Sequence, residues 1–220
     1  MKNKYVLFGF IILEAFILNT CKKDKTATFT LKGIVLDKSY GNVVTDAKIT
    51  LWANKIQTGI YSSGYEELTT FYTDKNGEYN VNVKLQKTAG YKISIRKYNY
   101  FDYDQTIPAD NFQPGGSYYT SYSIAPVGYI TIRAVNKFPY NKNDFISYRF
   151  TNGYLDCFSC CNNVTIKGYG ENFDSTYTCM AVGGTQLIIS WNVIKNGQYF
   201  YNNNPIYCKP FDTTYFEISY

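Results

Sequence analysis

The chain has 220 residues, with 22 Lys and Arg against 17 Asp and Glu, which gives a net charge of +5 at pH 7. These charges form no long basic block, so the composition excludes the electrostatic footprint of a nucleic-acid-binding protein. The sequence contains no His and therefore lacks the usual general base at neutral pH and the commonest metal ligand. Its 24 Tyr and 15 Phe favour pleated, half-buried sheets over helices. We expect an all-β protein that is not an enzyme, has no catalytic residues, and holds no cofactor or metal.

The first 21 residues have the layout of an export signal. Lys2 and Lys4 give a positive start, the run from Tyr5 to Leu18 is apolar apart from Glu14, and Cys21 follows shortly afterwards. The run is shorter than the roughly 20 residues that a membrane-spanning helix needs, and its length is typical of a cleaved signal. The segment resembles the signal peptides of bacterial lipoproteins, and the Cys-Lys-Lys-Asp start at Cys21 is similar to that of Bacteroidota lipoproteins.

This resemblance implies that a signal peptide over residues 1–20 is removed and that a lipid is attached to the thiol of Cys21. Residues 21–27 are then the lipidated Cys and a tether to the membrane. The expected location is the cell envelope, with the outer membrane favoured and its periplasmic or surface face left open. An ordinary cleaved signal and an uncleaved anchor are the two alternatives.

The first half of the remaining chain alternates apolar and polar residues, which predicts short β-strands. Strands are expected from Thr28 to Val35 and over residues 47–53, 78–83 and 91–96. Four blocks carry a family pattern: Gly33-x-Val35-x-Asp37, Ala47-x-Ile49-x-Leu51, Thr73-Asp74-x-x-Gly77-x-Tyr79 and Tyr91-x-Ile93-x-Ile95-x-Lys97. Their order and spacing resemble the carboxypeptidase-regulatory-like, or transthyretin-like, β-sandwich domain over residues 28–125. The resemblance implies an accessory module without catalytic residues. Within it, Asp74 and Gly77 predict a tight turn rather than a calcium loop.

A boundary near residues 125–128, marked by Pro and Gly, separates this half from a second series of alternating segments. We expect a second, Cys-containing β-sandwich over residues 126–220. The whole protein is then predicted to consist of two tandem antiparallel β-sandwich domains of the Ig-like or transthyretin-like kind. The predicted strands of the second half cover residues 129–135, 145–150, 164–168, 176–180, 185–193, 198–201 and 213–218.

Five cysteines lie in the second half: Cys157, Cys160, Cys161, Cys179 and Cys208. An exported chain meets an oxidising compartment, so these residues are disulfide candidates, and five cysteines allow at most two bridges within one chain. Adjacent Cys160 and Cys161 are poor partners for each other. One of them, or Cys157, is expected to pair with Cys179 and another with Cys208. A zinc site is the alternative, because Cys157-x-x-Cys160 has the spacing of thiolate ligands.

Two clusters, residues 98–104 and 118–122, combine aromatic rings with polar side chains. A flat ring can stack on a sugar while neighbouring carboxylates and amides bind its hydroxyl groups. Tyrosines that are half-buried at a sheet edge are the alternative explanation. Asp102 and Asp104 also raise the alternative of a glycosidase, which needs two carboxylates across a cleft. The candidate binding residues are Tyr98, Tyr100, Phe101 and Tyr103.

These features predict a non-enzymatic, membrane-anchored envelope lipoprotein that presents β-sandwich domains for binding a glycan or another envelope protein. The alternatives are an accessory component of a polysaccharide-degrading system and an envelope assembly or adhesion subunit, which would use an exposed strand edge. The expected partners are thus the membrane, through the lipid, and a glycan or protein, but not a nucleic acid.

Overall fold

The computed structural model describes residues 27–57, 60–61, 64–155 and 157–220. The predicted signal peptide and Cys21 lie outside the described residues. In the described ranges the chain forms strands β1 to β15 and one short 3₁₀ helix, η1 (Ala109–Asn111). The all-β prediction is therefore confirmed. No helix within these ranges is long and apolar enough to cross a membrane.

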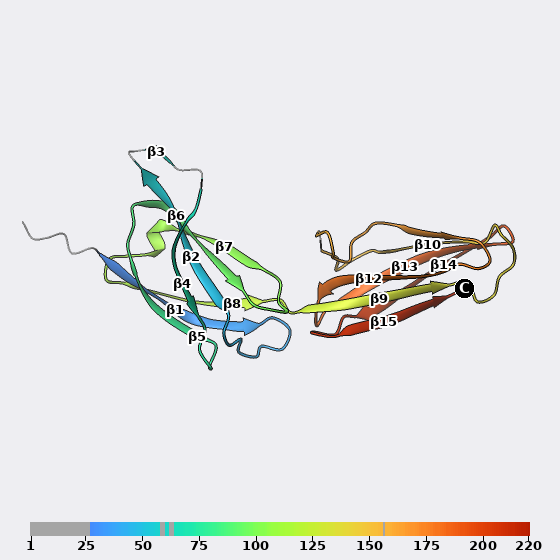
Figure 1. Ribbon diagram of the computed structural model, residues 1–220, viewed down its shortest axis with the longest axis horizontal. Coiled ribbons are helices and arrows are strands. Elements are labelled where there is room, and N and C mark those ends of the chain that lie inside the picture. The colour runs from blue at the N-terminus through green and yellow to red at the C-terminus, as the bar shows by residue number, and fades with distance from the viewer. Residues whose placement is uncertain (1–26, 58–59, 62–63, 156) are drawn as a thin grey trace, which may run out of the picture.

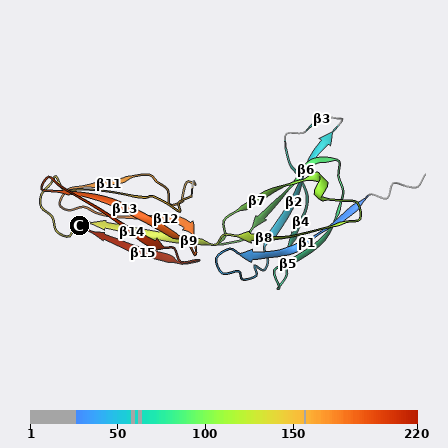
Figure 2. The same cartoon turned by 180° about the vertical axis from the view of Figure 1, so that it is seen from behind.

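The strands form two β-sandwich units that lie end to end in an elongated molecule (Figure 1). We call residues 27–126 the N-terminal unit and residues 127–220 the C-terminal unit. Each unit has its own cluster of buried apolar side chains, one drawn from residues 29–124 and the other from residues 130–220. The described chain starts at one end of the molecule, and the C-terminus lies at the other end (Figures 1 and 2).

Two sheets face each other in the N-terminal unit. The first has the order β5 (Glu78–Lys84), β1 (Thr28–Asp37), β8 (Ser117–Ile124). The second is built on β2 (Lys48–Gln57) and β6 (Thr88–Arg96), and its outer members are β3 (Ile60–Tyr61), β4 (Glu66–Tyr72) and β7 (Tyr103–Pro108). Alternate residues point inward and form the core, including Phe29, Leu31, Val35, Ile49, Leu51, Ile93 and Ile95.

Gly33 permits a close approach in the middle of the first sheet. A Cβ atom at this position would lie 1.6 Å from the carbonyl oxygen of Thr120 and 2.7 Å from the hydroxyl of Tyr79. The Tyr79 ring instead lies over the glycine, and its hydroxyl donates a hydrogen bond of 2.8 Å to that same carbonyl of Thr120. A glycine is therefore required where β1, β5 and β8 meet.

The C-terminal unit also pairs two sheets. One has the order β12 (Asp174–Val182), β9 (Val127–Val135), β15 (Thr213–Ser219). The other has the order β11 (Ile166–Tyr169), β10 (Phe145–Phe150), β13 (Gln186–Lys195), β14 (Gln198–Tyr207). All seven strands predicted for this half are present, several of them longer than expected. Inward-facing residues such as Ile130, Ile132, Tyr148 and Ile189 fill the core.

The sheets are not antiparallel throughout. β1 pairs with β8 in parallel, from Thr30 opposite Ser117 to Asp37 opposite Ile124. β15 pairs with β9 in parallel in the same way. In each unit, the last strand lies at the edge of the sheet, beside the first strand and in the same direction. A hairpin pattern in the sequence does not reveal this long-range pairing.

The junction between the two units is tightly connected. Only Ala125 and Pro126 separate β8 from β9, and both sides of this connection make further contacts. The N–H of Val127 donates to the carbonyl of Asn99 at 2.8 Å, and the N–H of Gly183 donates to the carbonyl of Pro126 at 2.8 Å. The hydroxyl of Ser39 donates to the carbonyl of Gly183, and the rings of Tyr100 and Phe211 lie 5.3 Å apart, centroid to centroid. Several contacts across the junction therefore fix the orientation of the units.

Two disulfides connect the cysteines. Cys157 bonds to Cys160 across a tight turn, with Cα atoms 5.1 Å apart, and Cys161 bonds to Cys179 on β12, with Cα atoms 4.9 Å apart. The expected bridge to Cys208 was wrong. Cys208 is a free, buried thiol that packs against Gly128, where a Cβ atom would lie 2.4 Å from its sulfur. Burial raises its pKa to about 11, so it is an inert core residue.

Candidate binding sites

The structure places the four predicted binding residues in different surroundings. Tyr98 is 87% exposed at the turn after β6. The partly buried ring of Tyr100 packs against Phe211 at the junction. Phe101, also partly buried, donates its N–H to the carbonyl of Ala125. These residues do not form one continuous aromatic surface.

Tyr103 faces the interior of the N-terminal unit. Its ring lies 5.5 Å from the ring of the buried Tyr122, and its hydroxyl donates to Oε1 of Gln105 at 2.8 Å. Burial, followed by the neighbouring Tyr118, raises the pKa of Tyr103. The half-buried packing that we considered for these rings describes Tyr103 and Tyr100 better than an open platform does.

Asp102 and Asp104 are both held by one guanidinium. Nε of Arg96 lies 3.1 Å from Asp102, and its Nη2 lies 2.8 Å from Asp104. Burial opposes the ionisation of Asp104, but hydrogen bonds from Arg96 and Ser94 outweigh this effect and lower its pKa. A carboxylate with a lowered pKa that is already paired is a poor proton donor at neutral pH. The two residues therefore do not have the arrangement that a glycosidase requires.

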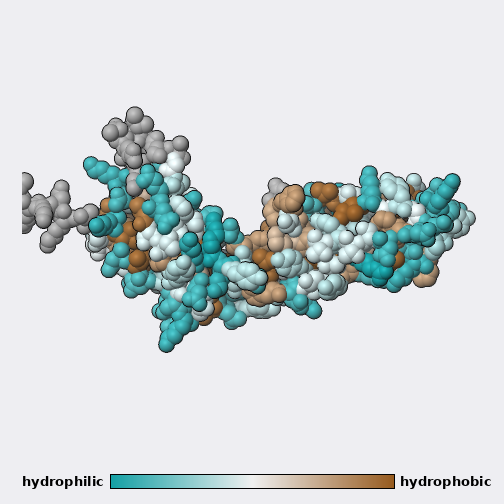
Figure 3. Space-filling model, viewed as in Figure 1, coloured by the Kyte–Doolittle hydropathy of each residue, from teal (hydrophilic) through white to brown (hydrophobic). Residues whose placement is uncertain are grey.

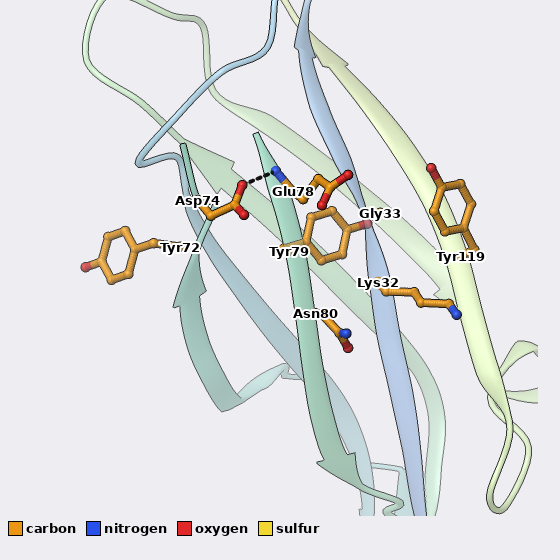
Figure 4. Close-up of a pocket in the computed structure, with 8 residues that line it drawn as sticks. All are labelled: Lys32, Gly33, Tyr72, Asp74, Glu78, Tyr79, Asn80 and Tyr119. Carbon is orange, nitrogen blue, oxygen red and sulfur yellow. Dashed lines mark hydrogen bonds between the residues drawn. The ribbon is translucent and has the colours of Figure 1, made fainter. Parts of the chain in front are cut away.

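A hollow of about 430 Å³ lies on the outer face of the first sheet of the N-terminal unit (Figure 4). Lys32 of β1, Glu78 and Asn80 of β5 and Tyr119 of β8 project from neighbouring strands, because Lys32 lies opposite both Asn80 and Tyr119 in the register. Tyr72 and Asp74 border the hollow on the side of β4.

The turn beside this hollow is the one predicted from the sequence. Oδ1 of Asp74 accepts the N–H groups of Asn76 at 2.8 Å and Glu78 at 2.9 Å, and Gly77 has a φ of +71°. Asp74 therefore builds the corner, while the side chains of Lys32, Glu78 and Asn80 are exposed on the sheet. Cation, carboxylate, amide and an exposed Tyr119 ring in one hollow suit a hydroxyl-rich ligand.

Sequence reasoning missed this hollow, although one signal was available. The polar residues of each strand alternate with core residues, so the outward faces of β1, β5 and β8 can be listed from the sequence. Which strands are neighbours cannot be read in this way, and the hollow exists only because β1 lies between β5 and β8.

A buried polar network at the far end of the C-terminal unit was also missed. Asp144 is 1% exposed. It accepts hydrogen bonds from Nδ2 of Asn136 at 2.9 Å and from the N–H of Tyr140 at 2.8 Å. Nζ of Lys195 lies 3.8 Å from Asp144, donates to Oδ1 of Asn136 at 2.7 Å and also bonds the carbonyl of Phe138. The network ties the loop between β9 and β10 to β13.

No cluster of three or more His, Cys, Asp or Glu side chains that could hold a metal ion occurs in the described part of the chain. The two sulfurs of Cys157 and Cys160, which had suggested a zinc site as the alternative, are bonded to each other.

No family model matches this chain, and no curated protein sequence matches it. Among solved structures, the chain is similar to the Bacillus anthracis TIE protein, with a TM-score of 0.38 and 12% identity over 88% of this chain and 34% of that protein. It is similar to 3-chlorocatechol 1,2-dioxygenase from Rhodococcus opacus 1CP, with a TM-score of 0.36 and 14% identity over 47% of this chain and 62% of the enzyme.

The shaft pilin SpaA from Lactobacillus rhamnosus GG has a TM-score of 0.31 and 10% identity, with 89% of this chain and 97% of the pilin covered. The chain thus spans only 34% of the TIE protein and 62% of the dioxygenase. At these TM-scores the similarities carry no conclusion about function, and the chain is identified from its own strands as an all-β protein of two sandwich-like units.

Proposed function

We propose that this protein is a lipid-anchored envelope protein that holds a ligand-binding unit away from a membrane. The observation that carries the proposal is the end-to-end arrangement of the two units. β1 begins at one end of the molecule, directly after the proposed tether, and the C-terminal unit extends from the opposite end (Figure 1). The contacts between Ser39 and Gly183 and between Tyr100 and Phe211 keep the units in line.

Binding rather than catalysis is proposed, on two grounds. The sequence has no His to act as a general base, and the carboxylates that suggested a glycosidase are paired with Arg96. The outer sheet faces instead offer exposed rings, amides and hydroxyl groups, including those of the hollow around Lys32 and Tyr119. An accessory role in a polysaccharide-degrading system and a role in envelope assembly or adhesion would use the same anchored architecture.

The anchor is tested by substituting the proposed lipid site. Cys21→Ser, combined with an ordinary cleaved export signal in place of residues 1–20 so that no apolar segment remains, is expected to remove the lipid and to move the protein from the detergent phase to the aqueous phase on phase partitioning. Cys208→Ser is the matched control, because Cys208 is buried in the C-terminal unit and its loss should leave partitioning unchanged. Equal partitioning of the Cys21→Ser variant and the unaltered protein contradicts the anchor.

The binding role is tested by capture from native membranes with the intact protein as bait. Recovery of a glycan or a single envelope protein in constant proportion supports the role. Recovery of an active polysaccharide-cleaving complex favours the accessory alternative, and hydrolysis of polysaccharide by the purified protein alone contradicts a purely binding function.

A further inference from the structure

The sheet β11-β10-β13-β14 presents an uncovered outer face in the C-terminal unit. Its inner face is buried, because residues such as Ile146, Tyr148 and Ile189 belong to the core. The alternate residues point outward in rows across the four strands. One row consists of Lys167, Ser147, Asn192 and Tyr201, and the next contains Arg149, Ser190 and Asn203.

This sheet carries cations without carboxylates. None of the residues in its four strands, all of them described, is Asp or Glu. Arg149 and Lys167 both project from the outer face and are exposed. Neither side chain forms an ion pair with a carboxylate in the described ranges. Lys195, the third cation of the sheet, is already held by Asn136 and Phe138.

A hollow of about 150 Å³ lies in the middle of this face. Arg149, Ser147, Asn192 and Ser190 line it, together with Tyr201. The hydroxyl of Tyr201 lies 3.4 Å from Oγ of Ser190, to which it donates, and 63% of the Tyr201 residue is exposed. The hollow therefore combines one unpaired guanidinium with hydroxyl and amide groups and an accessible ring.

Further aromatic residues extend the face beyond the hollow. Tyr199, which is 79% exposed, precedes Tyr201 on the same side of β14. Phe145 and Tyr169, whose ring centroids are 4.9 Å apart, lie in the same row as Tyr199, to which Ile194 connects them. The rings and polar groups together extend further than the length of one sugar. The face therefore suits a polysaccharide chain rather than a single small molecule. On the side of the C-terminal unit that Figure 3 shows, hydrophobic and hydrophilic residues are mixed.

We propose that this outer face binds an acidic polysaccharide whose negative groups are carboxylates, as in a chain of uronic acids. The planar guanidinium of Arg149 pairs with a carboxylate through two parallel N–H groups, and Lys167 meets the negative group of a neighbouring sugar. The Tyr201 ring packs against a pyranose face, while Asn192 and Ser147 bind ring hydroxyl groups. The absence of acidic side chains from the four strands removes the repulsion that such a ligand would otherwise meet.

This inference rests on the proposed binding function and adds a ligand class, but it does not require the anchor. It is tested by titrating the full-length protein in detergent with polygalacturonate, and with neutral galactan for comparison. Polygalacturonate should bind at least tenfold more tightly than galactan, and its affinity should fall as salt is raised. Arg149→Gln should weaken polygalacturonate binding at least tenfold, and Tyr201→Ala about fivefold or more. Arg149→Lys should fall in between, because it keeps the charge and loses the planar fork.

The matched control is Tyr215→Ala, since Tyr215 is a tyrosine on β15 in the opposite sheet that is even more exposed than Tyr201. The affinity of Tyr215→Ala for polygalacturonate should be unchanged, and all four variants should retain the melting temperature of the unaltered protein. Equal affinity for the two polysaccharides, no binding of either, or an equal loss in Tyr215→Ala overturns the site. Tighter binding of dextran sulfate than of polygalacturonate overturns the assignment to carboxylates. Each of these results can occur while Cys21→Ser still releases the protein from membranes, so the two proposals fail separately.

Discussion

The absence of a side chain at Gly33 lets β1, β5 and β8 pack closely in the first sheet. The block around Gly33 could be recognised from the sequence, but the sequence does not say why a glycine stands there. The reason lies in two residues that are distant in the chain, because the hydroxyl of Tyr79 and the carbonyl of Thr120 occupy the space above Gly33. Residues of this kind can be located by pattern, whereas their physical role needs the register of three strands.

Gly33→Ala should therefore strongly destabilise the N-terminal unit. The added methyl group must displace the Thr120 backbone or the Tyr79 ring, which should lower the free energy of unfolding by about 3 kcal/mol or more. Gly90→Ala is the matched control, because a Cβ atom at that strand position meets only the Ile107 carbonyl, at 3.4 Å. Its stability should change by less than about 1 kcal/mol. Urea denaturation of both variants measures the difference, and similar effects would contradict the close approach.

Asp144 should make the C-terminal unit sensitive to acid. Burial opposes its ionisation, but hydrogen bonds from Asn136 and two backbone N–H groups, with the charge of Lys195, lower its pKa below the ordinary value of 3.8. A carboxyl group with a lowered pKa in the folded state stabilises the fold above pH 3.8, and this contribution is lost as the pH falls through the lower folded-state pKa.

Asp144→Asn should reduce the free energy of unfolding at pH 7 by about 2 to 3 kcal/mol, because charged hydrogen bonds to a buried group are lost. The difference in free energy of unfolding between Asp144→Asn and the unaltered protein should shrink as the pH is lowered below 3.8. Asp174→Asn is the control: Asp174 pairs with Arg133 on the surface and its removal should leave stability nearly unchanged. A constant gap between Asp144→Asn and the unaltered protein from pH 7 to pH 2 would be the contrary result.

At the scale of elements, the period-two pattern located the strands that have one buried face. All seven strands of the C-terminal unit were predicted because their alternate residues are core residues. β3, β4 and β7 were missed. β4 has no fully buried residue, and β7 has only Ile107, so neither shows a clear alternation. The parallel pairings and both outer-face hollows could not be predicted from the sequence either. The alternating pattern shows on which face of its strand a residue lies, but it does not show which strands are neighbours.

The disulfide pairing can be tested at this scale. Removing Cys161–Cys179 by a double Cys→Ala substitution should lower the free energy of unfolding of the C-terminal unit by about 3 kcal/mol, because that bridge closes the longer loop. Removing Cys157–Cys160 in the same way should lower it by about 2 kcal/mol. Denaturation curves give both values, and peptide mapping of the non-reduced protein should recover these two bridges alone. A peptide that links Cys208 to another cysteine would refute the pairing.

For the whole molecule, the alignment of the two units depends on the junction. The sequence located the boundary near residues 125–128 but gave no sign that Ser39 bonds to Gly183 or that Tyr100 packs against Phe211 across it. These four residues belong to separate turns and loops, and only the folding of both units brings each pair together. The orientation of the units is consequently a property of tertiary structure that local patterns do not encode.

Phe211→Ala should loosen the junction without unfolding either unit. The variant loses the ring contact with Tyr100 but no residue of either buried core. Small-angle X-ray scattering should show a broader distribution of particle lengths than for the unaltered protein, while circular dichroism remains the same. Tyr98→Ala is the control, since Tyr98 lies nearby but is almost fully exposed. An unchanged scattering profile for Phe211→Ala would show that the remaining contacts suffice.

The parallel pairing of β1 with β8 has a mechanical consequence. The chain enters this pair at the start of β1 and leaves it at the end of β8, so tension applied through the two exits slides the strands past each other lengthwise. The hydrogen bonds along their shared register, from Thr30 to Asp37 on β1, then carry the load together. In a hairpin pulled apart from its open end, such bonds break one after another. A protein held at its N-terminus and loaded at its far unit would thus resist extension by shear.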